Sequence, residues 1–266
     1  MPIDGKPLDG RVKLADLLEH GLETSPDDPA VVSLRKKYTW RELDDESARL
    51  ASGLLSLGLE PGDRVASLIP NRCELLAYYI ACMKAGLVSV PLNYRYMPPE
   101  IDHALEVSGA RLIVAHSERV DDLSASRLVP GLDLGAVHYG PGVGGHRHFD
   151  DLLSGAPAPS ELPGVPEAAP AFIFFTSGST GPAKGVTHTY ESLSYMFAST
   201  SQGFEITSSD VMLADSSMSH IGAFMFSLCA LSLGARALVA TNTDPAELLT
   251  LMRRERPSVL CILPAA

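Results

Sequence analysis

The chain has 266 residues, of which 45% are hydrophobic, so it can form one large α/β domain or two small ones around a substantial core. Its 21 basic and 32 acidic side chains give a formal net charge of −11, which excludes nucleic-acid binding through the overall field of the protein. Any step that needs a positive charge must therefore use a local basic side chain.

The cysteines do not have the spacing of a metal site. Each lies in an apolar run and none forms a Cys-x-x-Cys pair, so we expect buried free thiols at Cys73, Cys82, Cys229 and Cys261. The first ten residues hold no apolar segment of signal-peptide length, and no run is long enough to span a membrane. We therefore expect a cytoplasmic protein without a membrane span.

Residues 1–139 are predicted to form a first region of alternating helices and strands. An amphipathic segment at 12–22 and a short strand at 31–34 come first. Thr39 and Glu42 follow, and their Thr-x-x-Glu spacing predicts a capping box at the start of a long helix.

The strands after this helix begin at a regular interval. Their predicted first residues are Arg64, Leu87, Arg111 and Gly135, a spacing of 23 to 24 residues. This is the length of a strand followed by a helix, and helices are predicted at 72–85 and 98–107. The spacing therefore indicates a parallel sheet that is covered by helices.

Residues 140–170 are predicted to be a linker or long loop without a core element, because 12 of these 31 residues are Gly or Pro. His146, Arg147 and His148 lie in this segment, but a short polar cluster without Cys or acidic spacing is weak evidence for a metal site. Three earlier histidines have no patterned partner and are predicted to be ordinary surface or core residues, namely His103, His116 and His138.

A second alternation is predicted over 171–266. Its strands are expected at 172–175, 211–214, 236–240 and 258–263. Its helices are expected from Tyr190 to about residue 200, at 221–233 and at 245–254. In open α/β sheets the ligand cleft lies at the carboxyl ends of such strands.

Residues 176–185, which follow the first of these strands, combine three glycines, four Ser or Thr residues and one Lys. The glycines can adopt positive φ and bring the backbone close to a ligand, and consecutive N–H groups form a concave anion site. The hydroxyls add donors and Lys184 adds a positive charge, so the composition favours binding of a polyphosphate. The alternative is a flexible Gly/Ser surface loop, but such linkers rarely follow an apolar strand and end on a lone Lys.

The spacing differs from the common phosphate-binding loop, in which Gly, Lys and then Ser or Thr are adjacent. Here Ala183 precedes Lys184 and Gly185 follows it. The segment instead resembles the signature loop of the adenylate-forming superfamily, which comprises acyl-CoA synthetases, luciferases and peptide-synthetase adenylation domains. It matches that loop at 176–181, at Lys184 and at Gly185, and it departs where Pro182 stands one residue before the family's Pro.

Four further segments, two of which overlap, resemble sequences of the same superfamily. YTWREL from Tyr38 is similar to its first core motif and MKAGLVSVPLN at 83–93 to its second, while PLNYRYMPPEI looks like acyl-CoA synthetases in particular. SMSHIGAFMFSL at 217–228 resembles the fourth motif. In that motif His220 and Gly222 match the His and Gly that border the acyl pocket of acyl-CoA synthetases.

The fourth motif also distinguishes two classes of acid. Peptide-synthetase adenylation domains have an Asp near the position of His220, which pairs with the amino group of their substrate. A His cannot supply that permanent negative charge. The apolar residues at 223–226 suit a fatty or aryl acid instead. The alternative is a helix whose apolar residues are only core, with His220 outside any site.

The resemblance implies the N-terminal part of an α/β adenylation domain with two flavodoxin-like layers of parallel sheet and helices. It implies an enzyme that joins a carboxylic acid to the α-phosphate of ATP, with Mg²⁺, releases pyrophosphate and passes the acyl group to coenzyme A. It implies ATP contacts for Thr176, Ser177, Gly178, Ser179, Thr180, Gly181, Lys184 and Gly185, with Lys184 and Thr180 as the catalytic residues. It implies acyl contacts for His220, Gly222 and Ala223, and it leaves the metal ligands unassigned.

Members of this family are about twice as long as the chain. Their Tyr-Gly-x-Thr-Glu stretch, ribose-binding Asp and C-terminal domain would lie beyond Ala266, so we expect a fragment that is inactive alone. Two other functions stay open at this point. One is an adenylating enzyme that loads a carrier protein, and the other is a binding module that keeps nucleotide or acyl contacts without catalysis.

Overall fold

The computed structural model describes residues 13–141, 147–155, 163–176, 181–241 and 245–262. The chain forms two compact units. The first unit comprises Met1–Asp44, Asn71–Leu76 and Tyr190–Ala266, and the second comprises Asp45–Pro70 and Ala77–Thr189. Both units are therefore assembled from segments that are far apart in the sequence, and each contains one β-sheet.

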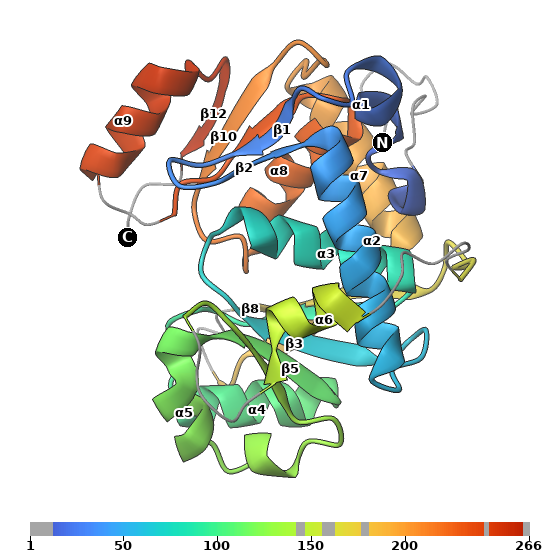
Figure 1. The fold of residues 1–266 in the computed structure, drawn as a ribbon, viewed down its shortest axis with the longest axis vertical. Coiled ribbons are helices and arrows are strands. Elements are labelled where there is room, and N and C mark those ends of the chain that lie inside the picture. Colours follow the sequence, from blue (N-terminus) through green and yellow to red (C-terminus); the bar gives the residue numbers. More distant parts are fainter. Residues whose placement is uncertain (1–12, 142–146, 156–162, 177–180, 242–244, 263–266) are drawn as a thin grey trace. The chain divides into compact units, whose positions relative to one another are not determined.

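The sheet of the first unit has the strand order β12-β10-β11-β1-β2 (Figure 1). Neighbouring strands are parallel except for β1 and β2, which are antiparallel. The strands are β1 (Pro29–Val32), β2 (Lys37–Thr39), β10 (Val211–Asp215), β11 (Arg236–Leu238) and β12 (Val259–Ile262). The helices are α1 (Glu19–Thr24), α7 (Tyr190–Gly203), α8 (Ile221–Ser232) and α9 (Pro245–Glu255), after a 3-10 turn at Leu14–Asp16.

Most side chains of the inner strands β1, β10 and β11 are buried. Val32 and Leu213 pack with Leu251 of α9 on one face, and α8 contacts the sheet at β10 and β11. Helix α8 is apolar around most of its circumference because α7 covers it as well. At that helix contact the ring centroids of Phe197 and Phe224 lie 6.3 Å apart. The core of the first unit therefore extends through α8.

The sheet of the second unit has the strand order β7-β6-β5-β3-β4-β8-β9. All neighbours are parallel except β8 and β9, which form an antiparallel hairpin. The strands are β3 (Arg64–Leu68), β4 (Val88–Pro91), β5 (Leu112–His116), β6 (Ala136–Tyr139), β7 (Arg147–His148), β8 (Pro170–Thr176) and β9 (Lys184–Thr189). The helices are α2 (Trp40–Ser56) and α3 (Cys73–Ala85), which both start in the first unit, and α4 (Pro98–Ser108), α5 (Val120–Ala125) and α6 (Phe149–Gly155).

Helices cover both faces of this second sheet. On one face Ile113 of β5 packs with Ile101 of α4 and Leu123 of α5, and Figure 1 shows both helices in green beside that sheet. On the other face the ring of Tyr79 on α3 meets the ring of Phe172 on β8 edge-on, with 5.5 Å between the centroids. The second unit is therefore a layered α/β structure in which the central strands β3, β4 and β5 are buried on both sides.

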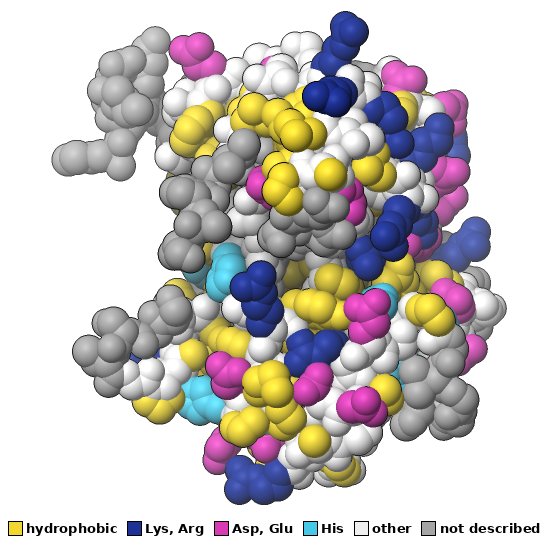
Figure 2. Space-filling view, turned by 90° about the vertical axis from the view of Figure 1, so that its left-hand side faces the viewer, with side chains coloured by type: hydrophobic (Ala, Val, Ile, Leu, Met, Phe, Trp, Pro, Cys, Tyr) yellow, Lys and Arg dark blue, Asp and Glu magenta, His cyan; other side chains and the backbone are white. Residues whose placement is uncertain are grey.

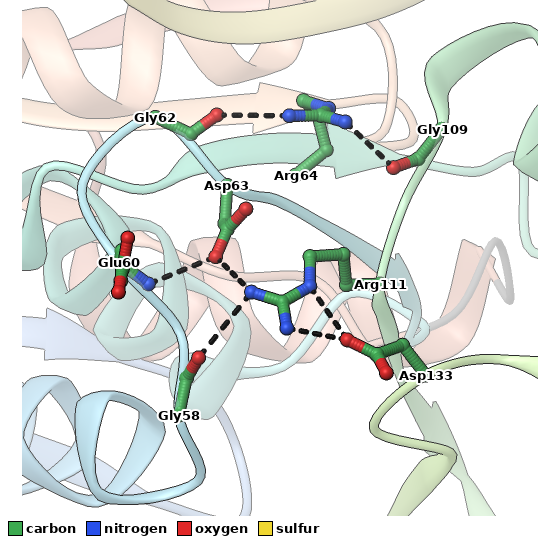
Figure 3. A network of polar contacts seen from close by, with 8 residues as sticks. All are labelled: Gly58, Glu60, Gly62, Asp63, Arg64, Gly109, Arg111 and Asp133. Carbon is green, nitrogen blue, oxygen red and sulfur yellow. Dashed lines mark hydrogen bonds and ion pairs between the residues drawn. The ribbon is translucent and has the colours of Figure 1, made fainter.

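An ion-pair network closes the amino-terminal edge of the second sheet (Figure 3). Arg111, just before β5, donates to the carboxylates of Asp63 and Asp133 and to the carbonyl of Gly58. The Asp63 carboxylate also accepts from the N–H of Glu60 at 2.9 Å. The loops at the amino ends of β3, β5 and β6 are thereby tied together, at the edge opposite to the one where open α/β sheets bind ligands.

The predicted fold class is confirmed, because the chain is α/β with two mixed but mostly parallel sheets. The capping box is also confirmed. The carboxylate of Glu42 accepts from the N–H of Thr39 at 2.8 Å, and the N–H of Glu42 donates to the Thr39 hydroxyl at 3.2 Å. The bonds from the backbone and hydroxyl of Thr39 lower the pKa of Glu42.

The prediction that residues 140–170 contain no core element is wrong for their described part. The helix α6 lies within this segment, and its apolar side chains Phe149 and Leu152 are buried three residues apart. The high Gly and Pro content of the segment concealed this short helical pattern. The division into 1–139, 140–170 and 171–266 stays a prediction, and both compact units draw on more than one of these regions.

Candidate functional site

A β-hairpin of the second unit closes the loop that carries the predicted phosphate contacts. β8 ends at Thr176 and β9 begins at Lys184, and these two residues are partners in the antiparallel ladder. The Thr176 hydroxyl donates to the Lys184 carbonyl at 3.4 Å. Because β8 runs parallel to β4, this end of the hairpin lies at the carboxyl edge of the sheet, where ligands bind in such folds.

Gly185 explains how β9 approaches β8 so closely. A Cβ atom at this position would lie 2.8 Å from Cγ2 of Ile173 and 3.7 Å from the ring of Phe175. The side chains of β8 therefore leave room only for a glycine at position 185 of β9. The neighbouring Lys184 side chain is exposed, and nothing lies within 4 Å of the place where a Cβ on Gly181 would stand. The described base of the loop thus presents backbone groups and a cation with little side-chain bulk.

A histidine on α4 supports the residue just before Lys184. Nε2 of His103 lies 2.7 Å from the carbonyl oxygen of Ala183, and the His103 ring meets Phe175 edge-on with 6.4 Å between centroids. Ala183 itself packs against the core beneath α4. The position where this chain departs from the signature loop is therefore held by the core. Sequence reasoning missed this contact because its acceptor is a backbone carbonyl 80 residues away.

The predicted acyl-site residues lie in the first unit, at the start of α8. His220 is the N-cap of this helix, with extended backbone at φ −103° and ψ 142°, and its side chain makes no capping hydrogen bond. His220 is exposed, Gly222 is half-buried and Ala223 is buried. His220 and Gly222 are therefore accessible to a ligand, and Ala223 is buried within its unit.

Two further polar residues, which sequence reasoning missed, flank the turn between β10 and α8. Asp215 ends β10, and burial raises the pKa of its carboxyl group. Asn71 donates from its side-chain amide to the carbonyl of Ser216 and accepts from the N–H of Met218. Neither residue lies in one of the motifs described above. Asp215 is distinguished by its burial and Asn71 by its bonds to backbone groups, and a sequence pattern reveals neither feature.

The structure thus brings the predicted site residues together in two groups. One hairpin of the second unit holds Thr176, Gly181, Lys184 and Gly185, and one helix start of the first unit holds His220, Gly222 and Ala223. Four predicted phosphate contacts lie outside the described residues, namely Ser177, Gly178, Ser179 and Thr180.

Within the described ranges, no group of three or more His, Cys, Asp or Glu side chains could hold a metal ion. His146 of the weak metal candidate lies outside these ranges, and Nε2 of His148 is 2.6 Å from the carbonyl oxygen of Gly140. The four cysteines are free, and burial raises the pKa of Cys82 to about 12. Cys73 and Cys229 are buried like Cys82, as predicted, whereas the prediction of a buried thiol is wrong for Cys261, which is only half-buried at the edge strand β12.

The surface and the helices add two observations. On the face drawn in Figure 2, acidic and basic side chains occur together with hydrophobic ones between them, so this face is not covered by one sign of charge. Among the helices that the structure describes, none has the length and apolar character needed to cross a bilayer.

The sequence matches one family model and several known proteins. The family model described as "AMP-binding enzyme" matches residues 18–266. A feruloyl-CoA synthase from Amycolatopsis sp is 34% identical over 247 residues, which cover 90% of this chain and 46% of that protein. Triostin synthetase I from Streptomyces triostinicus is 28% identical over 256 residues, which cover 95% of this chain and 48% of that protein.

The solved N-terminal domain of FACL13 from Mycobacterium tuberculosis, bound to an inhibitor, has a similar fold. The TM-score is 0.84 at 25% sequence identity, and the match covers 94% of this chain and 62% of that one. The chain spans about half the length of the two curated relatives named above.

Proposed function

Because the chain belongs to the AMP-binding family of adenylate-forming enzymes, we propose that its protein activates an apolar carboxylic acid with ATP. In the first step a carboxylate oxygen attacks the α-phosphorus of ATP, the bond from that phosphorus to the bridging oxygen breaks, and pyrophosphate leaves. In the second step the thiol of coenzyme A loses its proton and attacks the acyl carbonyl carbon, and AMP leaves with the bonding electrons. The products are an acyl-CoA, AMP and pyrophosphate.

The observation that carries this proposal is the pairing of Thr176 with Lys184 at the mouth of the β8–β9 hairpin. The exposed ammonium group of Lys184 would lie beside the β- and γ-phosphates of ATP. There it would stabilise the negative charge that grows on the departing pyrophosphate, and such preorganised charge carries most of the catalysis in phosphoryl chemistry. We assign the same phosphate-binding role to Ser177, Gly178, Ser179, Thr180, Gly181 and Gly185, with Thr180 as the second catalytic residue.

The acyl side of the site is proposed at the start of α8. The exposed side chain of His220 and the half-buried Gly222 would line the pocket for the acid, and the buried Ala223 would close its floor. An imidazole at this place supplies no permanent negative charge to pair with a substrate amino group, so we propose a fatty or aryl acid as the substrate. The feruloyl group in the name of the feruloyl-CoA synthase relative contains an aromatic ring, which supports the aryl alternative.

Magnesium and coenzyme A belong to the proposal as family partners. Mg²⁺ would accompany ATP and offset the charge of its phosphates when bound. The described residues do not include a cluster of metal ligands, so no step is assigned to the ion here.

The test is acid-dependent exchange between ATP and labelled pyrophosphate in the protein expressed at the full length of its gene. Replacing Lys184 with Ala should slow this exchange by roughly 10²–10³, the scale of removing one preorganised charge-stabilising group. Folding should be unchanged, because the Lys184 side chain is exposed. Lys37→Ala is the matched control, since Lys37 is also an exposed lysine on a β-strand but lies on β2. Exchange at the wild-type rate in Lys184→Ala would refute the assignment.

A second candidate differs only in the acceptor of the acyl group. In this candidate the acyl group passes to the thiol of a carrier protein instead of coenzyme A, an alternative that the sequence leaves open. The two acceptors are distinguished by supplying each thiol separately after adenylate formation. Thioester on coenzyme A alone supports the first candidate, and thioester on a carrier protein alone supports the second.

A further inference from the structure

The side chain of Asn71 makes two complementary hydrogen bonds to the turn that leads from β10 to α8. Its Nδ2 donates to the carbonyl oxygen of Ser216 at 2.7 Å, and its Oδ1 accepts from the N–H of Met218 at 2.9 Å. Turning the amide over would set donor against donor and acceptor against acceptor, so the two contacts fix its orientation. One side chain therefore holds a turn that lies 145 to 147 residues away in the sequence.

The same turn fixes the backbone of His220. The N–H of His220 donates to the carbonyl of Ser217 at 3.0 Å, and the hydroxyls of Ser217 and Ser219 lie 2.7 Å apart. On the other side the carbonyl of His220 accepts from the N–H of Phe224 at 3.3 Å, the first bond of α8. The backbone of His220 is thus held between the Asn71 contacts and the helix, while its side chain stays exposed.

The residues that follow Asn71 in the chain are held in place by contacts within the first unit. The next residue, Arg72, donates to the carbonyl of Thr241 at 3.3 Å. Glu74, in the first turn of α3, pairs with Lys36 at 2.9 Å, and its side chain is 10% exposed. Because its neighbours are held in this way, Asn71 can hold the turn between β10 and α8 in one defined geometry.

We propose that Asn71 is a positioning residue for the acyl side of the site. Its amide sets the turn at 216–219, and through that turn it sets the direction in which His220 faces the acid. This inference rests on the proposed role of His220 in acyl binding. It adds a determinant of acid affinity outside the motifs, in the segment between β3 and α3.

The kinetic test uses Asn71→Asp and Asn71→Ala in the protein at full gene length. Asp keeps an acceptor for Met218 but sets a carboxylate oxygen against the carbonyl of Ser216, and Ala removes both bonds. Each variant should raise the KM for the acid about tenfold, the effect of losing one or two such hydrogen bonds. The KM for ATP should stay within about twofold, because a hydrogen-bond loss this local leaves the hairpin of the second unit unchanged.

The matched control is Asn93→Asp, the same chemical change at a residue whose Oδ1 accepts from the N–H of Arg95 at 3.0 Å. A carboxylate oxygen accepts that bond equally well, so both KM values should be unchanged. In a His220→Ala background, Asn71→Asp should produce no further rise in the KM for the acid, since the residue acts through His220. Asn71→Ala, which introduces no repulsion, serves as the folded variant if Asn71→Asp fails to fold.

A purely structural brace would give a different result. It would lower the melting temperature in both Asn71 variants and leave the ratio of the two KM values as in wild type, and that result overturns the inference. Additive effects of Asn71→Asp and His220→Ala would overturn it as well. If the wild-type protein shows no acid-dependent exchange, the proposed function itself fails, which is a separate outcome from an active wild type with an unchanged Asn71 variant.

Discussion

Replacing Gly185 with Ala tests the packing that sets the base of the loop. The new Cβ would lie 2.8 Å from Cγ2 of Ile173, a separation that two carbon atoms do not sustain. The φ angle of Gly185 lies outside the left-handed region, so the backbone alone accepts an alanine. The predicted effect therefore comes from a single steric contact.

Two opposing contributions decide whether Gly185→Ala raises or lowers the free energy of unfolding. Ala in place of Gly stabilises a strand by about 0.5–1 kcal/mol, because the unfolded chain loses freedom. Overpacking against a stiff β-branched side chain costs about 1–3 kcal/mol. We therefore expect Gly185→Ala to lower the free energy of unfolding by about 1 kcal/mol, the difference of these terms. Because Lys184 precedes Gly185, the same shift should slow adenylation.

Urea unfolding of the chain, followed by circular dichroism, measures this difference. In an Ile173→Ala background the colliding methyl group is absent, and Gly185→Ala should cost nothing. Ile173→Val keeps that methyl group and should keep the cost. Gly203→Ala is the control, since nothing lies within 4 Å of its Cβ position at the end of α7. A Gly185→Ala protein as stable as wild type would refute the steric argument.

Two further predictions concern stability. Arg111→Met should lower the melting temperature more than Asp133→Asn does, because it leaves the 16% exposed side chain of Asp63 without its guanidinium partner, while Asp133 is 62% exposed. Equal effects of the two substitutions in thermal unfolding would contradict the network in Figure 3. Glu42→Gln should cost about 0.5–1 kcal/mol at neutral pH. Hydrogen bonds lower the pKa of Glu42 in the folded state, so this difference is complete above the ordinary value of 4.5 and is lost as the pH falls through the lowered pKa. A difference that stays constant down to low pH would argue against the capping bond.

Local sequence patterns predicted most helices and strands, because the spacing of apolar residues along a segment indicates which element it forms. The 23 to 24-residue spacing of the strands, for example, corresponds to β3, β4, β5 and β6 of one parallel sheet. The pairing of β1 with β11 was not predicted, since strand order depends on contacts between residues as distant as Val31 and Ala237. The edge strand β9 was missed because its side chains are mostly exposed and show no alternation.

The residues of the candidate site also fall into a predicted group and a group that was not predicted. Lys184 was predicted from the composition of its loop, and His220 from the resemblance of its segment to the fourth motif of the superfamily. Asn71 and His103 were not, because each contacts backbone atoms, and a backbone carbonyl leaves no pattern in the sequence. The part of a site that positions other groups is therefore visible only once the fold brings distant segments together.

Pyrophosphate exchange with a panel of acids tests the central claim most directly. The protein at full gene length would be supplied with ATP, Mg²⁺ and labelled pyrophosphate, together with fatty, aryl or amino acids in separate reactions. Because His220 stands where an amino-binding Asp would be, we predict exchange with fatty or aryl acids and none above background with amino acids. Exchange driven by amino acids alone, or by no acid in the panel, would contradict the proposed function.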